Sequence, residues 1–432
     1  MFVRRRLQSQ LGRRGNTAFE TCTAVRSSES ISRRLPACAA VRATAARNLS
    51  STPARRSVTV PPVPEPVLPP TSASPVWTSS SLVEKYARMP ITPVTLHELL
   101  QMGETHDLLS SAKFAHAELP KRMARRVKAL QNLPFIVGVN PYIKSVYQLY
   151  QDSLEKLIAL PAPVDPKSQQ FFTEELRTLV TAHQEVIPKL AKGFKECIRY
   201  MTKESATSFL DNMIHARIGI RVIAEHHLSL DTPAPAYIGV VNTRLAPASL
   251  ITSVANYSRE LCEFNYGNAP EFTVNGHTDT LMAYIGVHLE YIFMELLKNA
   301  MRATVEYSQR TGRFEHPTVE ISICQSKEAV IFRFRDQGGG ISPKDWAHIW
   351  DYSYTTVPKY DDGDGIFNTQ ARMSMQTGVG GPMAGLGFGL PMSRIYAKYF
   401  QGSLDIKSVD GHGCDVFLMV PNIIGARHVI ED

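Results

Sequence analysis

The feature that most constrains the fold is a change in hydrophobic period near Pro233. From about residue 80 to residue 232, apolar side chains recur every three or four positions, which is the spacing of the buried face of an amphipathic helix. The longest such stripe runs from Leu176 to Met201, and Pro188 within it is expected to kink the helix. At least four long helices are expected here, and a four-helix bundle is the simplest way to bury their apolar faces.

After Pro233 the sequence predicts strands mixed with helices. Four segments alternate apolar and polar residues with a period of two, as half-buried strands do: 318–324, 328–335, 403–409 and 414–420. Helical stretches lie among them at 248–264, 288–307 and 391–400. This order predicts an α/β sandwich, in which helices cover one face of a mixed sheet, and it makes the whole chain an α+β protein.

The first 56 residues differ in composition from the rest of the chain. They contain twelve arginines, two glutamates and no lysine or aspartate, so their net charge is +10. Because the net charge of the whole chain is +7, the remaining residues together carry −3. An Arg-rich leader with few acids is typical of a mitochondrial presequence, although a disordered basic tail has a similar composition. The mildly acidic remainder argues against a nucleic-acid surface, and no apolar run approaches the length of a membrane span.

These patterns divide the chain into four parts. We predict a presequence over 1–56, a proline-rich linker over 57–80, a helical bundle domain over 81–235 and a second domain over 236–432.

A potential metal ligand and a potential base share one face of the expected helix over 288–307. Glu295 and Asn299 are four positions apart, which places their side chains about 6 Å from each other on that face. An amide oxygen suits Mg²⁺, which prefers hard oxygen ligands, and a carboxylate one turn away can act as a base beside the ion. Taken alone, the pattern also fits an ordinary charged helix face.

Asp336 begins a second candidate motif. It follows an alternating strand and precedes Gly338 and Gly340, so its carboxylate could accept a hydrogen bond from an adenine amino group while the glycines let the base approach the backbone. The same segment could equally be a simple turn.

A third candidate motif could bind phosphate. The glycine-rich segment Gly385–Leu390 precedes an apolar helix, whose first backbone N–H groups attract an anion. The hydroxyl groups of Thr355 and Thr356 could contact phosphate as well, and the composition of 357–384 is that expected of a lid.

The order and spacing of these motifs resemble a known superfamily. Glu-x-x-x-Asn on a helix, Asp-x-Gly-x-Gly after a strand and Gly-x-Gly-x-Gly before a helix are similar to the N, G1 and G2 boxes of histidine kinases, gyrase-type ATPases and Hsp90-type chaperones. The chain contains no Walker A loop and no HRD or DFG motif of the eukaryotic protein kinases. The resemblance implies that 236–432 is an ATP-binding domain of the histidine-kinase type.

Other segments resemble one branch of this superfamily, the mitochondrial 2-oxo acid dehydrogenase kinases. The similar segments are His116–Pro120, Leu133–Pro141, Ala216–Arg221, Tyr266–Pro270 and Tyr396–Tyr399. The resemblance covers about residues 84–420. It implies a kinase of the mitochondrial matrix that phosphorylates serine on the E1 α subunit of a 2-oxo acid dehydrogenase complex and inactivates that component. It also implies binding to the lipoyl domain of the E2 core and a homodimer, with no nucleic-acid partner and no membrane insertion.

The resemblance also implies roles for individual residues. Glu295 would take the proton from the substrate serine, Asn299 would coordinate a Mg²⁺ that bridges the ATP phosphates, and Asp336 would bind the adenine amino group. The full ATP-binding set would be Asn299, Arg302, Asp336, Gly338, Gly340, Thr355, Thr356, Thr377, Gly385, Leu386, Gly387, Phe388, Gly389 and Leu390. A K⁺ site would use Ile349, Asp351 and Tyr354, and a pocket for a 2-oxo acid effector would use His183, Arg217 and Arg221.

Two members of the family compete as the counterpart of this chain. The segments Leu261–Pro270 and Asp351–Thr356, and Tyr291 four residues before Glu295, look closer to the branched-chain 2-oxo acid dehydrogenase kinase. The chain also stops soon after its last expected strand, without the Asp-Trp tail of the pyruvate dehydrogenase kinases. Tyr396–Gly402 looks like the pyruvate form instead. The branched-chain complex is therefore the expected substrate, and the pyruvate complex is the alternative.

Two other classes of protein stay open. The chain could be a non-catalytic module that binds ATP and docks on the complex, or it could be a histidine kinase or ATPase. In a histidine kinase His116 could accept phosphate, but we expect it to be hydrogen-bonded within the helical bundle.

Overall fold

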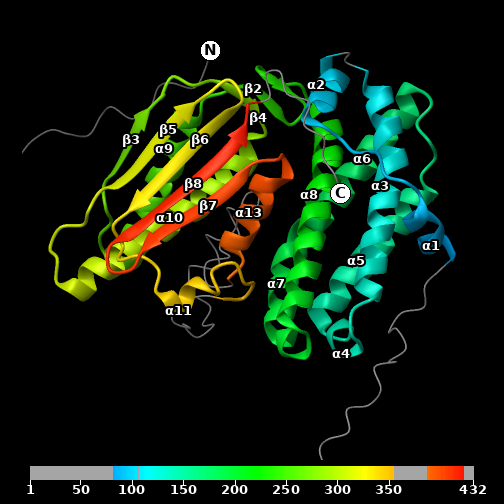
Figure 1. The fold of residues 1–432 in the computed structure, drawn as a ribbon. Coiled ribbons are helices and arrows are strands. Elements are labelled where there is room, and N and C mark those ends of the chain that lie inside the picture. The colour runs from blue at the N-terminus through cyan, green and yellow to red at the C-terminus, as the bar shows by residue number, and fades with distance from the viewer. Residues whose placement is uncertain (1–80, 105–106, 355–386, 423–432) are drawn as a thin grey trace, which may run out of the picture. The chain divides into compact units, whose positions relative to one another are not determined.

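The first half of the chain folds into helices, as its hydrophobic period predicts. The computed structural model describes residues 81–104, 107–354 and 387–422 (Figure 1). The helices of this half are α1 (Ser81–Arg88), α2 (Leu96–Glu104), α3 (Leu108–Gln131), α4 (Phe135–Gly138), α5 (Pro141–Ala159), α6 (Pro166–Ala182), α7 (Val186–Cys197) and α8 (Lys203–Asp231). Helix α3 packs against α5, α6 and α8, while α5 contacts α7 and α6 contacts α8, so the predicted bundle is confirmed.

The expected long helix from Leu176 to Met201 is interrupted. A 3₁₀ turn, η1 (His183–Glu185), separates α6 from α7, and a second, η2 (Ile198–Tyr200), follows α7. Pro188 therefore lies in the first turn of α7, where its missing N–H costs no helical hydrogen bond. The expected kink at Pro188 was wrong, because the chain leaves the helix five residues earlier, at His183.

The starts of the main helices are explained by capping residues. Asp107, Asn140 and Thr202 each accept a backbone hydrogen bond as the N-cap of α3, α5 and α8, respectively. Asp165 forms a capping box with Ser168 at the start of α6. Such caps satisfy N–H groups that have no partner within the helix.

The second half forms the mixed α/β arrangement that the sequence predicts. Its strands are β1 (Tyr237–Ile238), β2 (Val241–Leu245), β3 (Phe272–Gly276), β4 (Met282–Tyr284), β5 (Val319–Gln325), β6 (Ala329–Asp336), β7 (Ser403–Val409) and β8 (Gly413–Pro421). Its helices are α9 (Pro247–Tyr266), α10 (Gly286–Thr311), α11 (Pro343–Trp346) and α13 (Gly389–Tyr399). Strands β1, β2 and β4 make a small sheet, and the main sheet has the order β3-β5-β6-β8-β7, in which only the β3–β5 pair is parallel.

Helices cover one face of the main sheet. Along β6, Val330, Phe332 and Phe334 are buried, while Ile331 between them is partly exposed. Helices α9, α10 and α13 contact strands of this sheet, and Figure 1 shows α9 and α10 behind it. The described residues belong to one compact unit, Pro69–Asp432, so the boundary expected near residue 235 stays a prediction. None of the described helices combines the length and apolar character needed to span a membrane.

Candidate active site

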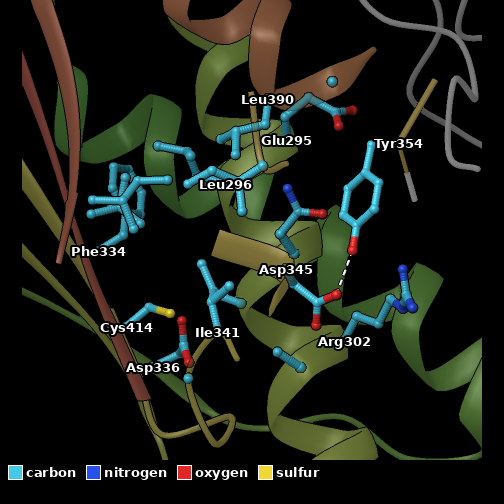
Figure 2. A pocket seen from close by; sticks show the side chains of 18 of the residues that line it. Glu295, Leu296, Arg302, Phe334, Asp336, Ile341, Asp345, Tyr354, Leu390 and Cys414 are labelled. Atoms are coloured by element: carbon cyan, nitrogen blue, oxygen red, sulfur yellow. Dashed lines mark hydrogen bonds between the residues drawn. The ribbon is translucent and has the colours of Figure 1, made fainter. Parts of the chain in front are cut away.

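A cavity of about 340 Å³ lies beside α10, at the end of β6 (Figure 2). It is enclosed by α10, the loop that follows β6, α11, the start of α13 and residues of β7 and β8. The predicted ATP-site residues that line it are Glu295, Asn299, Arg302, Asp336, Gly340, Gly387, Gly389 and Leu390. All three sequence motifs therefore contribute to one cavity.

Glu295 lies where α10 meets α13. It is 6% exposed, and its carboxylate forms an ion pair with Lys298 of the same helix. A Cβ atom on Gly389, the first residue of α13, would overlap Oε2 of Glu295, so glycine is needed there to leave room for the carboxylate. Asn299 lies one turn further along α10, is exposed, and lines the same cavity. The cavity wall thus combines a buried carboxylate with an accessible amide.

Asp336 ends β6 at the opposite side of the cavity and is 8% exposed. Its Oδ1 accepts a hydrogen bond of 2.9 Å from the backbone N–H of Gly338. Burial raises the pKa of Asp336 to about 6, although backbone hydrogen bonds from Gly338 and Cys414 oppose the shift. Above this pH the side chain is an ionised acceptor in a mostly dry position.

The glycines after Asp336 have two different structural roles. Gly340 lines the cavity with φ +72°, and a Cβ there would overlap the carbonyl oxygen of Val409. Gly338 instead packs against Ala303 and Thr304 of α10, which lets the loop approach that helix closely. Both glycines were predicted to bind ATP, but only Gly340 is among the residues that line the cavity.

The start of α13 forms the third wall. Gly387 has φ +71°, and a Cβ there would overlap the backbone of Tyr354. Phe388 is the N-cap residue of α13, and its side chain accepts no hydrogen bond from the helix. The side chain at the N-cap therefore does not satisfy the backbone N–H groups of the first turn. The Phe388 ring is fully buried, 4.8 Å from the ring of Tyr352, and does not face the cavity. The predicted residues Thr355, Thr356, Thr377, Gly385 and Leu386 lie outside the described residues.

Of the three residues expected to hold K⁺, two line the main cavity and one, Asp351, does not. Ile349 and Tyr354 line the cavity. The carboxylate of Asp351 is engaged elsewhere, 2.6 Å from Lys203 Nζ and 2.8 Å from His348 Nδ1. Only a backbone oxygen of Asp351 could serve in such a site.

Several residues that line the cavity were not predicted from the sequence, and Asp345, Glu306 and Ile341 are examples. Asp345 faces the cavity and accepts a hydrogen bond from the Tyr354 hydroxyl (Figure 2), which lowers the pKa of the Asp345 carboxyl. Glu306 lines it too and accepts a 2.7 Å bond from Nε of Arg302. The only local signal for Asp345 is that Ser342, three residues earlier, caps α11. Ile341 faces the cavity from the loop after β6, and no sequence signal marks it.

The proposed effector residues lie in the helical half. Arg217 donates a 2.7 Å hydrogen bond to the carbonyl oxygen of His183, and the His183 ring is 2.8 Å from the Ser153 hydroxyl. Burial, and secondarily Arg217, lowers the pKa of His183 to about 3. Arg217 and Arg221 line a separate cavity of about 70 Å³ next to α10 and α13, whereas His183 is not among its lining residues.

His116 has the environment expected of a structural residue. Its Nε2 lies 3.0 Å from the carbonyl oxygen of Leu160, and its ring packs edge-on at 5.7 Å against Phe172.

The donor set of the main cavity suits a magnesium ion that arrives with a nucleotide. Among the described residues, no group of three or more His, Cys, Asp or Glu side chains is placed to hold a metal. The cavity does offer the Asn299 amide and the Glu295 carboxylate. Mg²⁺ bound to nucleotides commonly takes one or two protein oxygens and completes its shell with phosphates and water.

Comparison with known proteins gives the class first. The model of the family described as histidine kinase-, DNA gyrase B- and HSP90-like ATPase matches residues 285–423, which contain α10, the main cavity and β8. The second half is therefore an ATPase domain of this class, as the motifs predicted. A second model, described as mitochondrial branched-chain alpha-ketoacid dehydrogenase kinase, matches residues 93–242.

Relatives along most of the chain then define the family. The pyruvate dehydrogenase (acetyl-transferring) kinase of Arabidopsis thaliana mitochondria is 32% identical over 78% of this chain and 92% of its own length. Isozyme 4 of Rhinolophus ferrumequinum is 30% identical and isozyme 1 of Homo sapiens 29%, over 82% and 79% of their lengths. This chain belongs to the family of mitochondrial 2-oxo acid dehydrogenase kinases. It is a protein kinase, and the predictions of ATP use and a mitochondrial location are confirmed.

The same comparisons qualify one prediction. The curated relatives named above are kinases of pyruvate dehydrogenase, so the expected preference for the branched-chain complex is not confirmed and the alternative is better supported.

Proposed function

We propose that this kinase transfers the γ-phosphoryl group of ATP to a serine on the E1 α subunit of the pyruvate dehydrogenase complex in the mitochondrial matrix and thereby inactivates that component. The observation that carries the proposal is that Glu295 and Asn299 of the first motif, Asp336 of the second and Gly389 of the third line one cavity. The relatives, which are named for pyruvate dehydrogenase, support the choice of complex.

In this proposal Glu295 is the general base. Its carboxylate pairs with Lys298 and lies close to Gly389, which places it at the edge of the cavity. A base in a fixed position can accept the proton of the serine hydroxyl as the oxygen attacks phosphorus. Phosphoryl transfer depends mainly on positioning and charge neutralisation, so no covalent histidine intermediate is needed.

The other cavity residues would bind the nucleotide. Asp336 would accept a hydrogen bond from the adenine amino group, and the raised pKa of its carboxyl predicts weaker adenine binding as the pH falls through about 6. Asn299 would supply an oxygen to Mg²⁺, which neutralises phosphate charge when it is bound. The N–H groups at the start of α13 would contact phosphate oxygens, and Thr355, Thr356, Thr377, Gly385 and Leu386 would complete the set.

Further parts of the proposal rest on the family. Arg217 and Arg221 would bind the carboxylate of a 2-oxo acid effector beside His183. Ile349, Asp351 and Tyr354 would bind K⁺ through backbone oxygens. We also propose docking on lipoyl domains of the E2 core and a homodimer.

A second candidate substrate is the branched-chain complex. The model named for its kinase matches residues 93–242. Tyr291 also lies one turn before Glu295, with its buried ring 5.0 Å from Tyr396.

Incubation with labelled ATP and each purified complex tests these proposals. We expect acid-stable phosphoserine on E1 α of the pyruvate complex, and labelling that is slower by at least about 10²-fold when the kinase carries Glu295→Gln. Label on the branched-chain complex alone would transfer the proposal to the second candidate. An acid-labile label would indicate histidine chemistry, and the absence of label on either complex would indicate a docking module.

A further inference from the structure

The segment 350–354, which follows α11, contacts both the helical half and α13. On the side of α13, the guanidinium group of Arg394 lies 4.5 Å from the centre of the Trp350 ring. On the side of α8, Nζ of Lys203 lies 2.6 Å from the carboxylate of Asp351. This segment therefore connects a helix of the bundle with the helix that forms one wall of the candidate active site.

Within this segment, the side chain of Tyr352 contacts both helices at once. Its hydroxyl donates a hydrogen bond of 2.6 Å to Oδ1 of Asp211, which lies on α8 and is 141 positions away in the chain. Its ring lies 4.8 Å from the ring of Phe388, measured between centres, and both residues are buried. A hydrogen bond to a carboxylate is roughly twice as strong as one between neutral groups. The bond to Asp211 therefore fixes the ring of Tyr352 relative to α8.

Phe388 carries this contact to the start of α13. It is the N-cap residue of that helix, and its carbonyl oxygen accepts a hydrogen bond of 3.0 Å from the N–H of Met392. The carbonyl oxygen of Gly387, the preceding residue, accepts a bond of 3.1 Å from the N–H of Ser353. Because protein interiors are close-packed, a shift of the Tyr352 ring must displace the Phe388 ring and the backbone attached to it.

The N-terminal end of α13 is the end that lines the main cavity. Its first N–H groups are those proposed to contact the phosphates, and its first residue, Gly389, lies against the carboxylate of Glu295. The other end of α13 meets α8 directly, where the rings of Tyr399 and His215 lie 4.9 Å apart. Tyr352 thus bridges α8 and α13 at the end where the candidate active site depends on the position of the helix.

We propose that Asp211 and Tyr352 are positioning residues for the kinase reaction, which hold the start of α13 where it binds the phosphates of the nucleotide. Neither residue is among those that line the main cavity, so both act through Phe388 and the backbone around it. The inference rests on the proposed function, because it requires that the start of α13 binds phosphate. It predicts that loss of the hydrogen bond weakens binding of the phosphates but not of adenine, whose proposed partner is Asp336.

Calorimetric titration of the full chain with Mg-ADP and with adenosine tests the inference. Adenosine has the adenine ring but no phosphate, so its affinity reports the adenine side of the cavity alone. Tyr352→Phe removes the hydroxyl and keeps the ring, and Asp211 is partly exposed, so water can replace the lost donor. We expect the affinity for Mg-ADP to fall at least about fivefold, the lower end of typical couplings, and that for adenosine to stay within about twofold.

Further variants show whether the hydrogen bond itself is responsible. Asp211→Asn retains an oxygen that can accept from Tyr352, so this variant should bind Mg-ADP more tightly than Asp211→Ala does. The double variant Asp211→Ala/Tyr352→Phe should bind no more weakly than either single variant, because both changes remove the same bond. The matched control is Tyr147→Phe, which removes a buried hydroxyl that accepts a 3.3 Å bond from Gln131 within the bundle and should leave Mg-ADP affinity unchanged.

Four results would overturn the inference: unchanged Mg-ADP affinity in Tyr352→Phe, an equal loss for adenosine, additive losses in the double variant, or an equal loss in Tyr147→Phe. If Tyr352→Phe does not fold, the comparison of Asp211→Ala with Asp211→Asn decides in its place. Failure of the proposed function would show in the wild type instead, where Mg-ADP would bind no more tightly than adenosine. If the wild type prefers Mg-ADP and the variants match it, only the inference fails.

Discussion

The cavity beside α10 and the cavity between α3 and α8 have the same volume, about 340 Å³, but opposite charge. The first is lined by the carboxylates of Glu295, Glu306, Asp336 and Asp345 and by one arginine, Arg302. The second is lined by Arg122, Arg125 and Arg126, with no acid among its lining residues. Two cavities of equal volume in one chain can therefore suit different ligands, because the choice depends on the side chains that line them and not on their size.

The largest effect is expected from Glu295→Gln, which keeps the shape of the first cavity and removes its base. We expect the rate of phosphoryl transfer to fall by about 10²–10⁴-fold, the usual contribution of a general base. ATP affinity, measured by calorimetry, should stay within a few-fold of wild type. A wild-type turnover rate on the dehydrogenase would disprove the role of Glu295.

Gly389→Ala tests whether the position of that carboxylate matters as much as its presence. The new Cβ would overlap Oε2 of Glu295, and the end of this flexible side chain can move at little cost to stability. We expect turnover to fall by about 10²-fold, because small misplacements of a catalytic group are costly. An unchanged melting temperature serves as the control, and unchanged turnover would contradict the expectation.

Asp336→Asn should separate binding from stability. Loss of a charged acceptor should weaken ATP binding about tenfold or more. The folded pKa of about 6 lies above the ordinary 3.8, so wild-type stability falls as the pH rises from about 4 to about 6 and stays reduced above it. The asparagine variant should lack this fall and be more stable near neutral pH, by about 3 kcal/mol at most.

Denaturant unfolding at about pH 4 and about pH 8 measures that difference. If both proteins lose equal stability between the two pH values, Asp336 is not the group that titrates.

The smallest effect is expected from Arg177→Ala, an arginine outside both cavities. Its partners Asp231 and Glu174 lie 3.4 and 3.8 Å away, and its side chain is 43% exposed. Exposed ion pairs contribute about 0–1 kcal/mol, so unfolding free energy should change by less than about 1 kcal/mol. A larger loss would mean that exposed arginine ion pairs stabilise this bundle more than such pairs usually do.

Much of the fold could be predicted because it follows from local pattern. The alternation in 328–335 marks β6 with one residue of error, and the helix expected over 288–307 is the central part of α10. The interruption at His183 could not be predicted, because the apolar stripe runs on through the 3₁₀ turn without a change of period. A prediction based on period alone cannot distinguish one long helix from two that share a buried face.

The site was predicted in outline for a similar reason. Glycines in a motif can mark positions where a Cβ would clash, and Gly340, Gly387 and Gly389 are such positions. Gly338 has the same signal but packs on α10, so the motif alone overstated its part in binding. Asp345 reaches the cavity through the placement of the short helix α11, and its one local signal, the capping Ser342, does not indicate a binding role.

The sequence by itself determined which segments become helices and strands and which chemical groups the kinase motifs contain, because period, capping and glycine position act over a few residues. Only the tertiary structure decided which of those groups face a common space. Burial of Asp336, the contact between Glu295 and Gly389, and the meeting of Arg126 with α8 all join segments far apart in the chain. Such contacts depend on how whole elements pack, and packing is set by the sum of many apolar contacts rather than by any local pattern.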